Sequence, residues 1–279
     1  NLWIHEPHTP FHVDPKLQKR FAELGEKDAI YAATLFHADL RIGQLLDALD
    51  RLNLAKDTLV IFSSDNGPAR GAPDAPLTLG YDSATGLGYG IAAAKGITGG
   101  RKGYKAALFE GGVGVPFIAR WPGKIAAGKV DKTSIFSAVD LLPTFCEIAG
   151  VKLPASYRPD GVSQVETLQG NGKVLREKTL FWKTIAPWPA RKTKPDHWVS
   201  YAVVSKNWKL VANRDAGYVE LYDLVTDPLE KNDLKERHPK VVKELTKALE
   251  QWQMTLPTKP TGNVFSNLRN PKKLHETKK

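Results

Sequence analysis

The sequence has 279 residues, of which 42% are hydrophobic, and a formal net charge of +10. This length accommodates a sizeable core in one large domain, or in one large domain and a small one. No run of about eighteen apolar residues occurs, and residues 1–5 lack the basic-then-apolar order of a signal peptide, so we expect no membrane anchor in this chain. The single cysteine, Cys146, excludes a disulfide framework and a cysteine metal cluster.

Half of the net positive charge lies in residues 255–279, where six basic residues accompany the single acidic residue Glu276. Such a tail is usually solvated. The remaining excess is spread along the chain and favours an anionic substrate over a cationic one. Basic residues are not interleaved with aromatic ones along any element, so we expect no nucleic-acid partner.

The first half of the chain has an α/β pattern. Apolar residues recur at three- and four-residue steps over 27–54, which predicts an amphipathic helix. Residues 59–62 are apolar on both faces, as in a strand in the middle of a parallel sheet. A glycine-rich loop over 71–103 is too long for a simple connection and is therefore a candidate functional loop. A second strand (115–119) and a second helix (139–149) follow.

The second half has a different pattern. Three short alternating segments, 198–205, 208–212 and 218–222, are separated by turn residues and predict an antiparallel meander. A closing helix over 239–254 places four apolar residues on one face: Val242, Leu245, Leu249 and Trp252. We place the boundary between the two parts near residue 172.

Polar residues follow the first buried strand directly, in Ser64-Asp65-Asn66-Gly67-Pro68. Asp-Asn-Gly is a common tight-turn sequence, so a simple turn is one interpretation. Ligands in open α/β sheets, however, bind at the carboxyl ends of strands. There, Asp65 and Asn66 offer one anionic and one neutral oxygen to a hard cation such as Ca²⁺ or Mg²⁺.

A second candidate lies in the glycine-flanked segment Gly103-Tyr104-Lys105. Glycines let the backbone approach a ligand closely, and Lys105 would be a compact positive charge for sulfate or phosphate. The alternative is that Lys102 and Lys105 are ordinary surface lysines. We expect Glu110 to make structural hydrogen bonds within its glycine-rich turn rather than acid–base chemistry.

Three histidines fall within eight residues of a predicted strand end, at positions 5, 8 and 12. Their spacing matches no zinc pattern, and Pro7 and Pro10 exclude a regular helix that would align them. As a functional residue, His8 would donate a hydrogen bond to an anionic ester or protonate its leaving group. A plain polar loop is the alternative.

These segments together resemble the sulfatase family of the alkaline-phosphatase-like superfamily. The resemblance rests on EPHTPFH, the helix and strand ending in TLVIFSSDNGP, GYKAALFEGGVGVPFIARWPGKI, SAVDLLPTFCEIAGV, PDGVS and ELYDLVTDPLEKNDL, in this order up to about Trp252. It implies an α/β fold with an alkaline-phosphatase-like mixed sheet sandwiched by helices, incomplete here, and then a small α+β domain with an antiparallel sheet. The expected units are 1–172, 173–256 and a basic tail, 257–279.

The resemblance also implies a chemistry. Asp65 and Asn66 would be two ligands of a catalytic Ca²⁺, with Mg²⁺ as the alternative. Lys105 and His8 would contact the sulfate, one of them near the bridging oxygen that leaves. The nucleophile of this family is a formylglycine made from a Cys/Ser-x-Pro-x-Arg motif. The substrate would be a sulfated small molecule or a sulfated glycan. A sugar sulfate is expected, because the segment NLWIHEPHTPFH resembles that of bacterial N-acetylgalactosamine-6-sulfatase-like and arylsulfatase A-like members.

The chain departs from the family in one respect that affects activity: it contains no Cys/Ser-x-Pro-x-Arg motif. We therefore interpret it as the middle and C-terminal part of a sulfatase, inactive alone, with an exposed sheet edge and apolar face. The family implies a secreted or periplasmic location. The sequence does not indicate an oligomeric state.

Two other functions remain open. A phosphodiesterase or phosphonate hydrolase of the same superfamily would use the same metal geometry. A non-catalytic module for sulfated glycans would use the basic surface and four aromatic platforms: Trp182, Trp188, His197 and Trp198.

Overall fold

The computed structural model describes residues 2–82, 86–170, 176–184, 199–213 and 218–257. Short helix α1 (Pro15–Arg20) is capped by Asp14, whose side chain accepts a hydrogen bond from the Lys16 amide. The 3-10 turn η1 (Ala22–Leu24) connects it to the long helix α2 (Glu26–Arg51). The predicted helix over 27–54 is confirmed, and its last residues lead into a further 3-10 turn, η2 (Ala55–Asp57).

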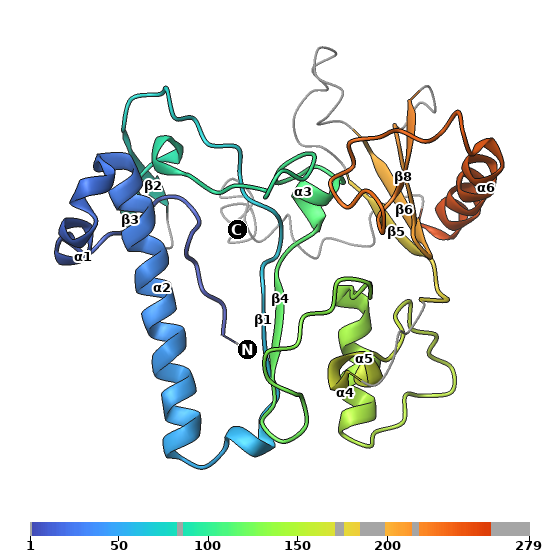
Figure 1. The fold of residues 1–279 in the computed structure, drawn as a ribbon, viewed down its shortest axis with the longest axis horizontal. Helices are drawn as coiled ribbons and strands as arrows, with labels where there is room; N and C mark the ends of the chain where they lie inside the picture. Colours follow the sequence, from blue (N-terminus) through green and yellow to red (C-terminus); the bar gives the residue numbers. More distant parts are fainter. Residues whose placement is uncertain (1, 83–85, 171–175, 185–198, 214–217, 258–279) are drawn as a thin grey trace, which may run out of the picture.

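Only the first turns of α2 are deeply buried. Ile30 and Ala33 pack there, and Ile30 belongs to a cluster with Phe11, Ala93 and Ala94. The rest of the helix exposes several leucines, among them Leu35 and Leu45. In Figure 1 this exposed part of α2 runs along one side of a two-stranded ribbon, and helix α4 lies on the other side.

That ribbon consists of β1 (Val60–Ser63) and β4 (Phe117–Arg120), which pair antiparallel. The expectation of a parallel sheet around residues 59–62 was therefore wrong for the described part of the chain. An apolar run indicates a strand that can be buried, but it does not indicate the direction of the partner strand. Here the segment between the two strands reverses the chain, so β4 runs antiparallel to β1. The expected apolar face is present, because Phe62 and Ile118 remain 42% and 59% exposed.

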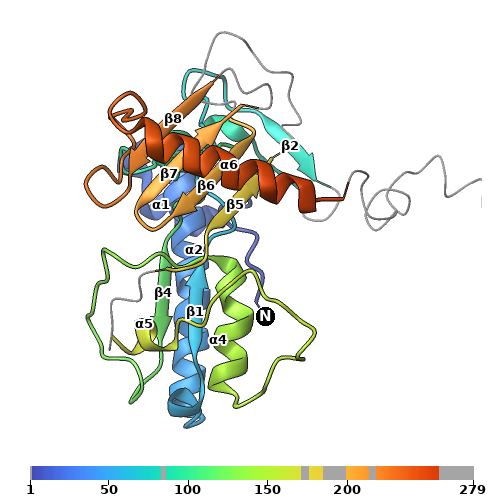
Figure 2. The ribbon, with the colours of Figure 1, turned by 90° about the vertical axis from the view of Figure 1, so that its right-hand side faces the viewer.

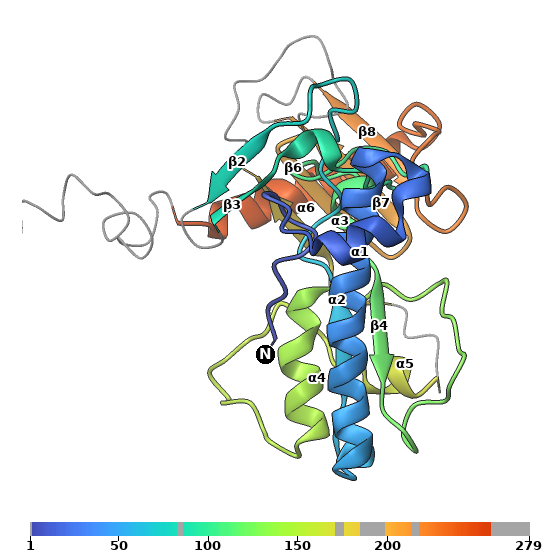
Figure 3. The same ribbon diagram turned by 90° about the vertical axis from the view of Figure 1, so that its left-hand side faces the viewer.

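The glycine-rich segment between β1 and β4 contains regular structure that the sequence did not reveal. Strands β2 (Leu79–Asp82) and β3 (Gly86–Tyr89) form a hairpin, followed by the 3-10 turn η3 (Ile91–Ala93). The Phe11 amide and carbonyl both pair with Tyr89, which fastens the N-terminal segment to this hairpin. Figure 3 shows α1 and the start of α2 near the hairpin. A short helix, α3 (Glu110–Val113), precedes β4.

Beyond β4, the 3-10 turn η4 (Ala138–Asp140) leads into α4 (Leu141–Ile148), as predicted, and α5 (Val165–Gln169) follows. Asp140 is fully buried and accepts hydrogen bonds from the amides of Ser137 and Val162. It also forms a buried ion pair with Arg176 at 2.6 Å. Removing one partner of such a pair would leave an uncompensated buried charge, so the pair fixes the connection around α4.

The predicted meander is confirmed as a four-stranded antiparallel sheet in the order β5-β6-β7-β8. Its strands are β5 (Leu180–Lys183), which the sequence analysis missed, β6 (Tyr201–Ser205), β7 (Trp208–Ala212) and β8 (Val219–Asp223). Helix α6 (Pro239–Thr255) lies across one face, as Figure 2 shows. The helix residues Leu245 and Leu249 pack there with Leu210 and Leu221, as the predicted apolar face requires.

The opposite face of this sheet is covered by a segment from the first half of the chain. Leu108 and Phe109 form a second cluster with Val211 and Tyr222. The two halves are therefore joined by a shared core. The predicted boundary near residue 172 lies outside the described residues and stays a prediction. None of the helices within the described ranges is long and apolar enough to cross a membrane.

Leu249→Ala is expected to lower the free energy of unfolding by about 2–5 kcal/mol, because it leaves a cavity between α6 and the sheet. Urea unfolding followed by circular dichroism measures the change. Met254→Ala in the same helix is the control: Met254 is 81% exposed, so about 0.5 kcal/mol or less is expected. Equal losses in the two variants would contradict the packing described for α6.

Candidate active site

The loop after β1 holds the two predicted metal ligands in an ordered turn. Ser64 Oγ donates to the Asn66 carbonyl at 2.9 Å, and Asn66 Nδ2 donates to the Gly67 carbonyl at 3.0 Å. The Asp65 side chain is exposed and Asn66 is half-buried. The amide nitrogen of Asn66 is thus engaged with the backbone, which leaves its oxygen as the atom that can bind a cation.

The structure joins this loop to the segment that carries Lys105. The Gly67 amide donates to the Gly112 carbonyl at 2.8 Å, and the Lys105 amide donates to the Pro68 carbonyl at 2.9 Å. A Cβ atom on Gly67 would lie 1.9 Å from the Gly111 carbonyl oxygen, so only glycine permits this approach. Two motifs that lie about forty residues apart in sequence therefore adjoin one another.

Lys105 lies in a tight turn and is exposed. Gly103 and Ala106 both adopt positive φ, +81° and +72°, and the Ala107 amide donates to the Tyr104 carbonyl at 2.9 Å. Ala107 and Phe109 are buried directly after the turn. The turn is therefore anchored in the core while its tip presents the lysine to solvent.

His8, the fourth predicted site residue, lies in a separate segment near the N-terminus. Its ring is exposed, its Nδ1 donates to the Thr9 carbonyl at 2.6 Å, and it packs edge-to-face with His5 at 5.5 Å. Phe11, three residues later, is buried and fastened to Tyr89. In the part of the chain described here, no hydrogen bond or ion pair joins His8 to the loops of Asp65 and Lys105.

A complete metal site is not formed by the described residues. Among them, no group of three or more His, Cys, Asp or Glu side chains converges as metal ligands would. Asp65 and Asn66 supply oxygen donors, which suits Ca²⁺ in type, whereas Ca²⁺ takes about six to eight ligands. Their donor chemistry fits a hard cation, and their number falls short of a full coordination shell.

For Lys102, the alternative of an ordinary surface lysine is wrong. Its ammonium forms an ion pair with Glu220 at 2.8 Å and donates a hydrogen bond to the Tyr222 hydroxyl at 3.0 Å. It also lies 4.4 Å from the centre of the Phe109 ring. Burial, together with the hydrogen bond to Glu220, raises the pKa of Tyr222, so its hydroxyl stays protonated as a donor.

Glu110 is structural, as expected, but its partners come from the C-terminal half. Its carboxylate pairs with Lys209 at 2.7 Å, and its amide donates to Glu230 at 2.6 Å. Lys209 also contacts Glu230 at 2.8 Å, and both side chains are fully buried. Burial raises the pKa of Glu230, while Lys209 acts in the opposite direction. Sequence reasoning missed these partners, although a lysine within the otherwise apolar strand β7 was a visible signal.

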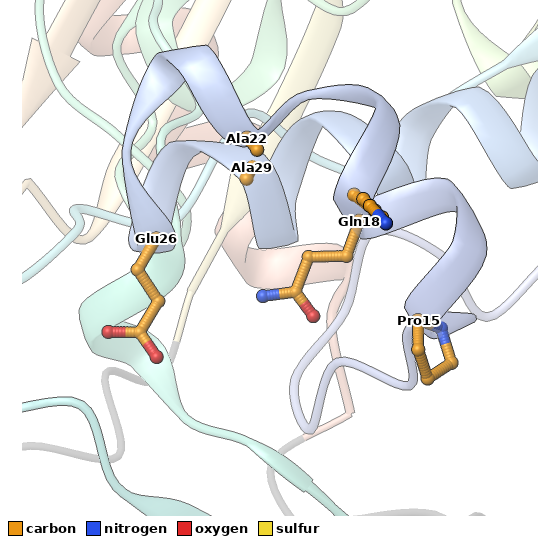
Figure 4. Close-up of a pocket in the computed structure, with 6 residues that line it drawn as sticks. Pro15, Gln18, Ala22, Glu26 and Ala29 are labelled. Carbon is orange, nitrogen blue, oxygen red and sulfur yellow. The ribbon is translucent and has the colours of Figure 1, made fainter.

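Trp182 is partly buried against the core of the C-terminal sheet, and the other three aromatic platforms lie outside the described residues. A shallow open pocket of about 370 Å³ lies between α1 and α2 and is shown in Figure 4. Its lining consists of Pro15, Gln18, Lys19, Ala22, Glu26 and Ala29. None of the predicted site residues lines it.

Comparison with known proteins identifies the family. The Sulfatase family matches residues 2–151, and the family described as N-sulphoglucosamine sulphohydrolase, C-terminal, matches residues 101–255. The chain therefore belongs to the sulfatase family, which confirms the resemblance seen in the sequence.

Individual relatives agree with this assignment. The chain is 30% identical over 230 residues to the N-acetylgalactosamine-6-O-sulfatase of Bacteroides thetaiotaomicron, covering 77% of this chain and 40% of the relative. It is 30% identical over 263 residues to human steryl-sulfatase, covering 85% and 42%. The chain thus spans less than half the length of these curated relatives.

Solved structures confirm the fold. The crystal structure of Ps i-CgsB in complex with k-i-k-neocarrahexaose aligns with a TM-score of 0.68 at 23% identity, covering 88% of this chain and 48% of that one. A structure from work on glycosaminoglycan metabolism by Bacteroides thetaiotaomicron gives a TM-score of 0.66 at 25% identity, covering 90% and 49%. The expected alkaline-phosphatase-like fold class is thereby supported.

Gly67→Ala is expected to separate the two site loops, because its Cβ would clash with the Gly111 carbonyl. Overpacking of this kind costs about 1–3 kcal/mol of unfolding free energy. Hydrogen exchange of the Lys105 amide, which crosses the same junction, should quicken at the same time.

Gly43→Ala is the matched control for this substitution. Gly43 lies in α2 with nothing within 4 Å of its added Cβ, so alanine should stabilise the helix by about 0.5–1 kcal/mol. Unchanged stability and exchange in the Gly67 variant would show that the two loops are not in the contact described.

Proposed function

We propose that the protein to which this chain belongs is a sulfuric ester hydrolase that acts on a sulfated sugar. The observation that supports this most directly is the pair of backbone hydrogen bonds that joins the Asp65–Pro68 loop to the Lys105 turn. A carboxylate, an amide oxygen and an ammonium on adjoining loops suit a hard cation and an oxyanion together. The name of the N-acetylgalactosamine-6-O-sulfatase relative supports a sugar sulfate as substrate.

In this proposal Asp65 and the Asn66 amide oxygen are two of the ligands of a Ca²⁺ ion, with Mg²⁺ as the alternative. The hydrogen bond from Asn66 Nδ2 to the Gly67 carbonyl would orient the amide so that its oxygen is available. A bound Ca²⁺ would offset negative charge on the sulfate oxygens. The further ligands would come from water, substrate or residues outside the described ranges.

Lys105 would place its ammonium against the sulfate, and either Lys105 or His8 would lie near the bridging oxygen. The hydrogen bond from His8 Nδ1 to Thr9 leaves Nε2 as the ring nitrogen that can face a ligand. Such fixed positive groups favour the charge that develops in the transition state. We assign the attack on sulfur to no residue of this chain, because it contains no Cys/Ser-x-Pro-x-Arg motif. In the complete protein, a formylglycine is proposed for that role.

Family membership also leads us to propose a secreted or periplasmic location and a sulfated glycan as the natural partner. The non-catalytic glycan module receives less support, because Trp182 packs against the core instead of forming an open platform. The assay below also tests the alternative of a related phosphodiesterase, because it includes a phosphate ester.

Lys105→Ala is expected to lower the rate of sulfate ester hydrolysis about 10²–10³-fold, because it removes a positive group fixed against the sulfate. The assay compares N-acetylgalactosamine 6-sulfate with the corresponding phosphate ester. It is run on this chain alone and on the complete protein. Lys124→Ala, at an exposed position beyond β4, is the control and should leave the rate unchanged. A preference for the phosphate ester would contradict the proposed reaction, and turnover by the chain alone would contradict its expected inactivity.

Asp65→Ala is expected to weaken Ca²⁺ binding at least tenfold, because one anionic ligand of a hard cation is removed. Isothermal titration calorimetry of the complete protein with CaCl₂ measures the affinity. Asp74→Ala, in the nearby glycine-rich segment, is the control and keeps the same change in net charge. An equal loss of affinity in both variants would show that Asp65 acts only through overall charge.

A further inference from the structure

Two charged side chains lie on a covered face of the C-terminal sheet. Lys209 and Val211 lie two residues apart on β7 and share this face, and so do Glu220 and Tyr222 on β8. Lys209 is the cross-strand neighbour of Tyr222. Lys209 is 0% exposed and Glu220 is 9% exposed. Burying a lone charge in this way is costly unless an opposite charge accompanies it.

The opposite charges come from the segment that carries Lys105. Glu110 pairs with Lys209 at 2.7 Å, and Lys102 pairs with Glu220 at 2.8 Å. Each half of the protein thus contributes one lysine and one glutamate to reciprocal ion pairs. Their members in this segment, Lys102 and Glu110, lie three residues before and five residues after Lys105.

Glu230 completes this arrangement. Its carboxylate lies 2.8 Å from the Lys209 ammonium and accepts the Glu110 amide at 2.6 Å. Its backbone adopts φ +56°, which is unusual for a residue other than glycine. The preceding residue, Leu229, accepts the Lys102 amide at 3.3 Å. Residues 229–230 therefore contact both ends of the Lys105 segment.

The segment is also closed on itself and joined to the loop of Asp65. The Gly111 amide donates to the Lys102 carbonyl at 2.6 Å, so the residues between them form a compact turn. The Gly67–Gly112 and Lys105–Pro68 hydrogen bonds then connect this turn to the proposed metal ligands. Through this continuous set of contacts, a displacement at Glu110 would shift Asp65, Asn66 and Lys105.

We propose that Lys209 is a positioning residue, which fixes the Lys105 turn and the Asp65–Asn66 loop through its ion pairs with Glu110 and Glu230. Because the Lys209 side chain is fully buried, it would touch neither substrate nor metal. The catalytic part of this inference rests on the proposed function. The positioning of the two loops is a structural property, which can be measured without turnover. The C-terminal domain is then part of the active-site framework.

Lys209→Met tests this proposal by residue-resolved hydrogen exchange of the chain. The Lys105 and Gly67 amides, which cross between the two site loops, are expected to exchange at least tenfold faster than in the wild type. The amides that pair β6 with β7 should change much less. Lys235→Met is the matched control, because Lys235 forms a partly exposed ion pair with Asp233 in the same half of the chain. It should leave the Lys105 and Gly67 amides unchanged.

A triple variant separates positioning from simple stability. Lys209→Met combined with Glu110→Gln and Glu230→Gln leaves no unpaired charge, so the unfolding midpoint should recover most of its loss. The bridging ammonium is still absent, so the Lys105 and Gly67 amides should remain fast. Recovery of slow exchange together with the midpoint would overturn the proposal, as would uniform acceleration across the sheet in the single variant.

The catalytic consequence is measured separately. In the complete protein, Lys209→Met should lower kcat on a sulfate ester about ten- to a hundredfold, because small displacements of catalytic groups are costly. Lys235→Met should leave kcat unchanged. If the wild type does not hydrolyse sulfate esters, the proposed function fails, whereas the exchange result still decides whether Lys209 positions the loops. Unchanged kcat with fast loop exchange would overturn the catalytic part.

Discussion

The buried ammonium of Lys209 is the interaction on which much of the remaining structure depends. It lies on a sheet face where an unpaired charge would be unstable, and its two partners, Glu110 and Glu230, belong to segments far apart in sequence. The C-terminal sheet can therefore bury this face only when the glycine-rich turn is docked on it. Leu108 and Phe109 then cover the sheet on the side opposite α6. Apolar packing favours association of the two halves, and the ion pairs fix how the halves are aligned.

Glycine makes the site itself possible. At Gly67 the backbone of one loop approaches the Gly111 carbonyl more closely than any side chain would allow, and the two loops share hydrogen bonds as a result. The anchored turn behind them holds Lys105 at an exposed tip. An exposed cation on a rigid support suits oxyanion binding, since little order has to be gained when the ligand arrives. The sulfatase family to which the chain belongs acts on substrates with such a group.

The β1–β4 ribbon contrasts with the well-packed C-terminal half. Apolar side chains remain exposed on both strands and on α4, including Phe62, Ile118 and Phe145. The C-terminal sheet, by comparison, buries both of its faces, one under α6 and one under the glycine-rich turn. The stability of the described chain is therefore concentrated where the turn, the sheet and α6 meet. This is also the region that supports the proposed site.

The sequence by itself determined the long helix, the meander, the closing helix and the family, because periodicity, turn residues and motif order are local properties of the chain. It also marked Asp65, Asn66, Lys105 and His8 as candidates, and the structure brings the loops of the first three together. Only the tertiary structure decided that β1 runs antiparallel to β4, because an apolar run does not encode the direction of its partner. Only the tertiary structure showed that Lys102 and Lys209 are structural. Their roles depend on glutamates about a hundred residues away, and no local pattern specifies which distant charge a side chain will meet.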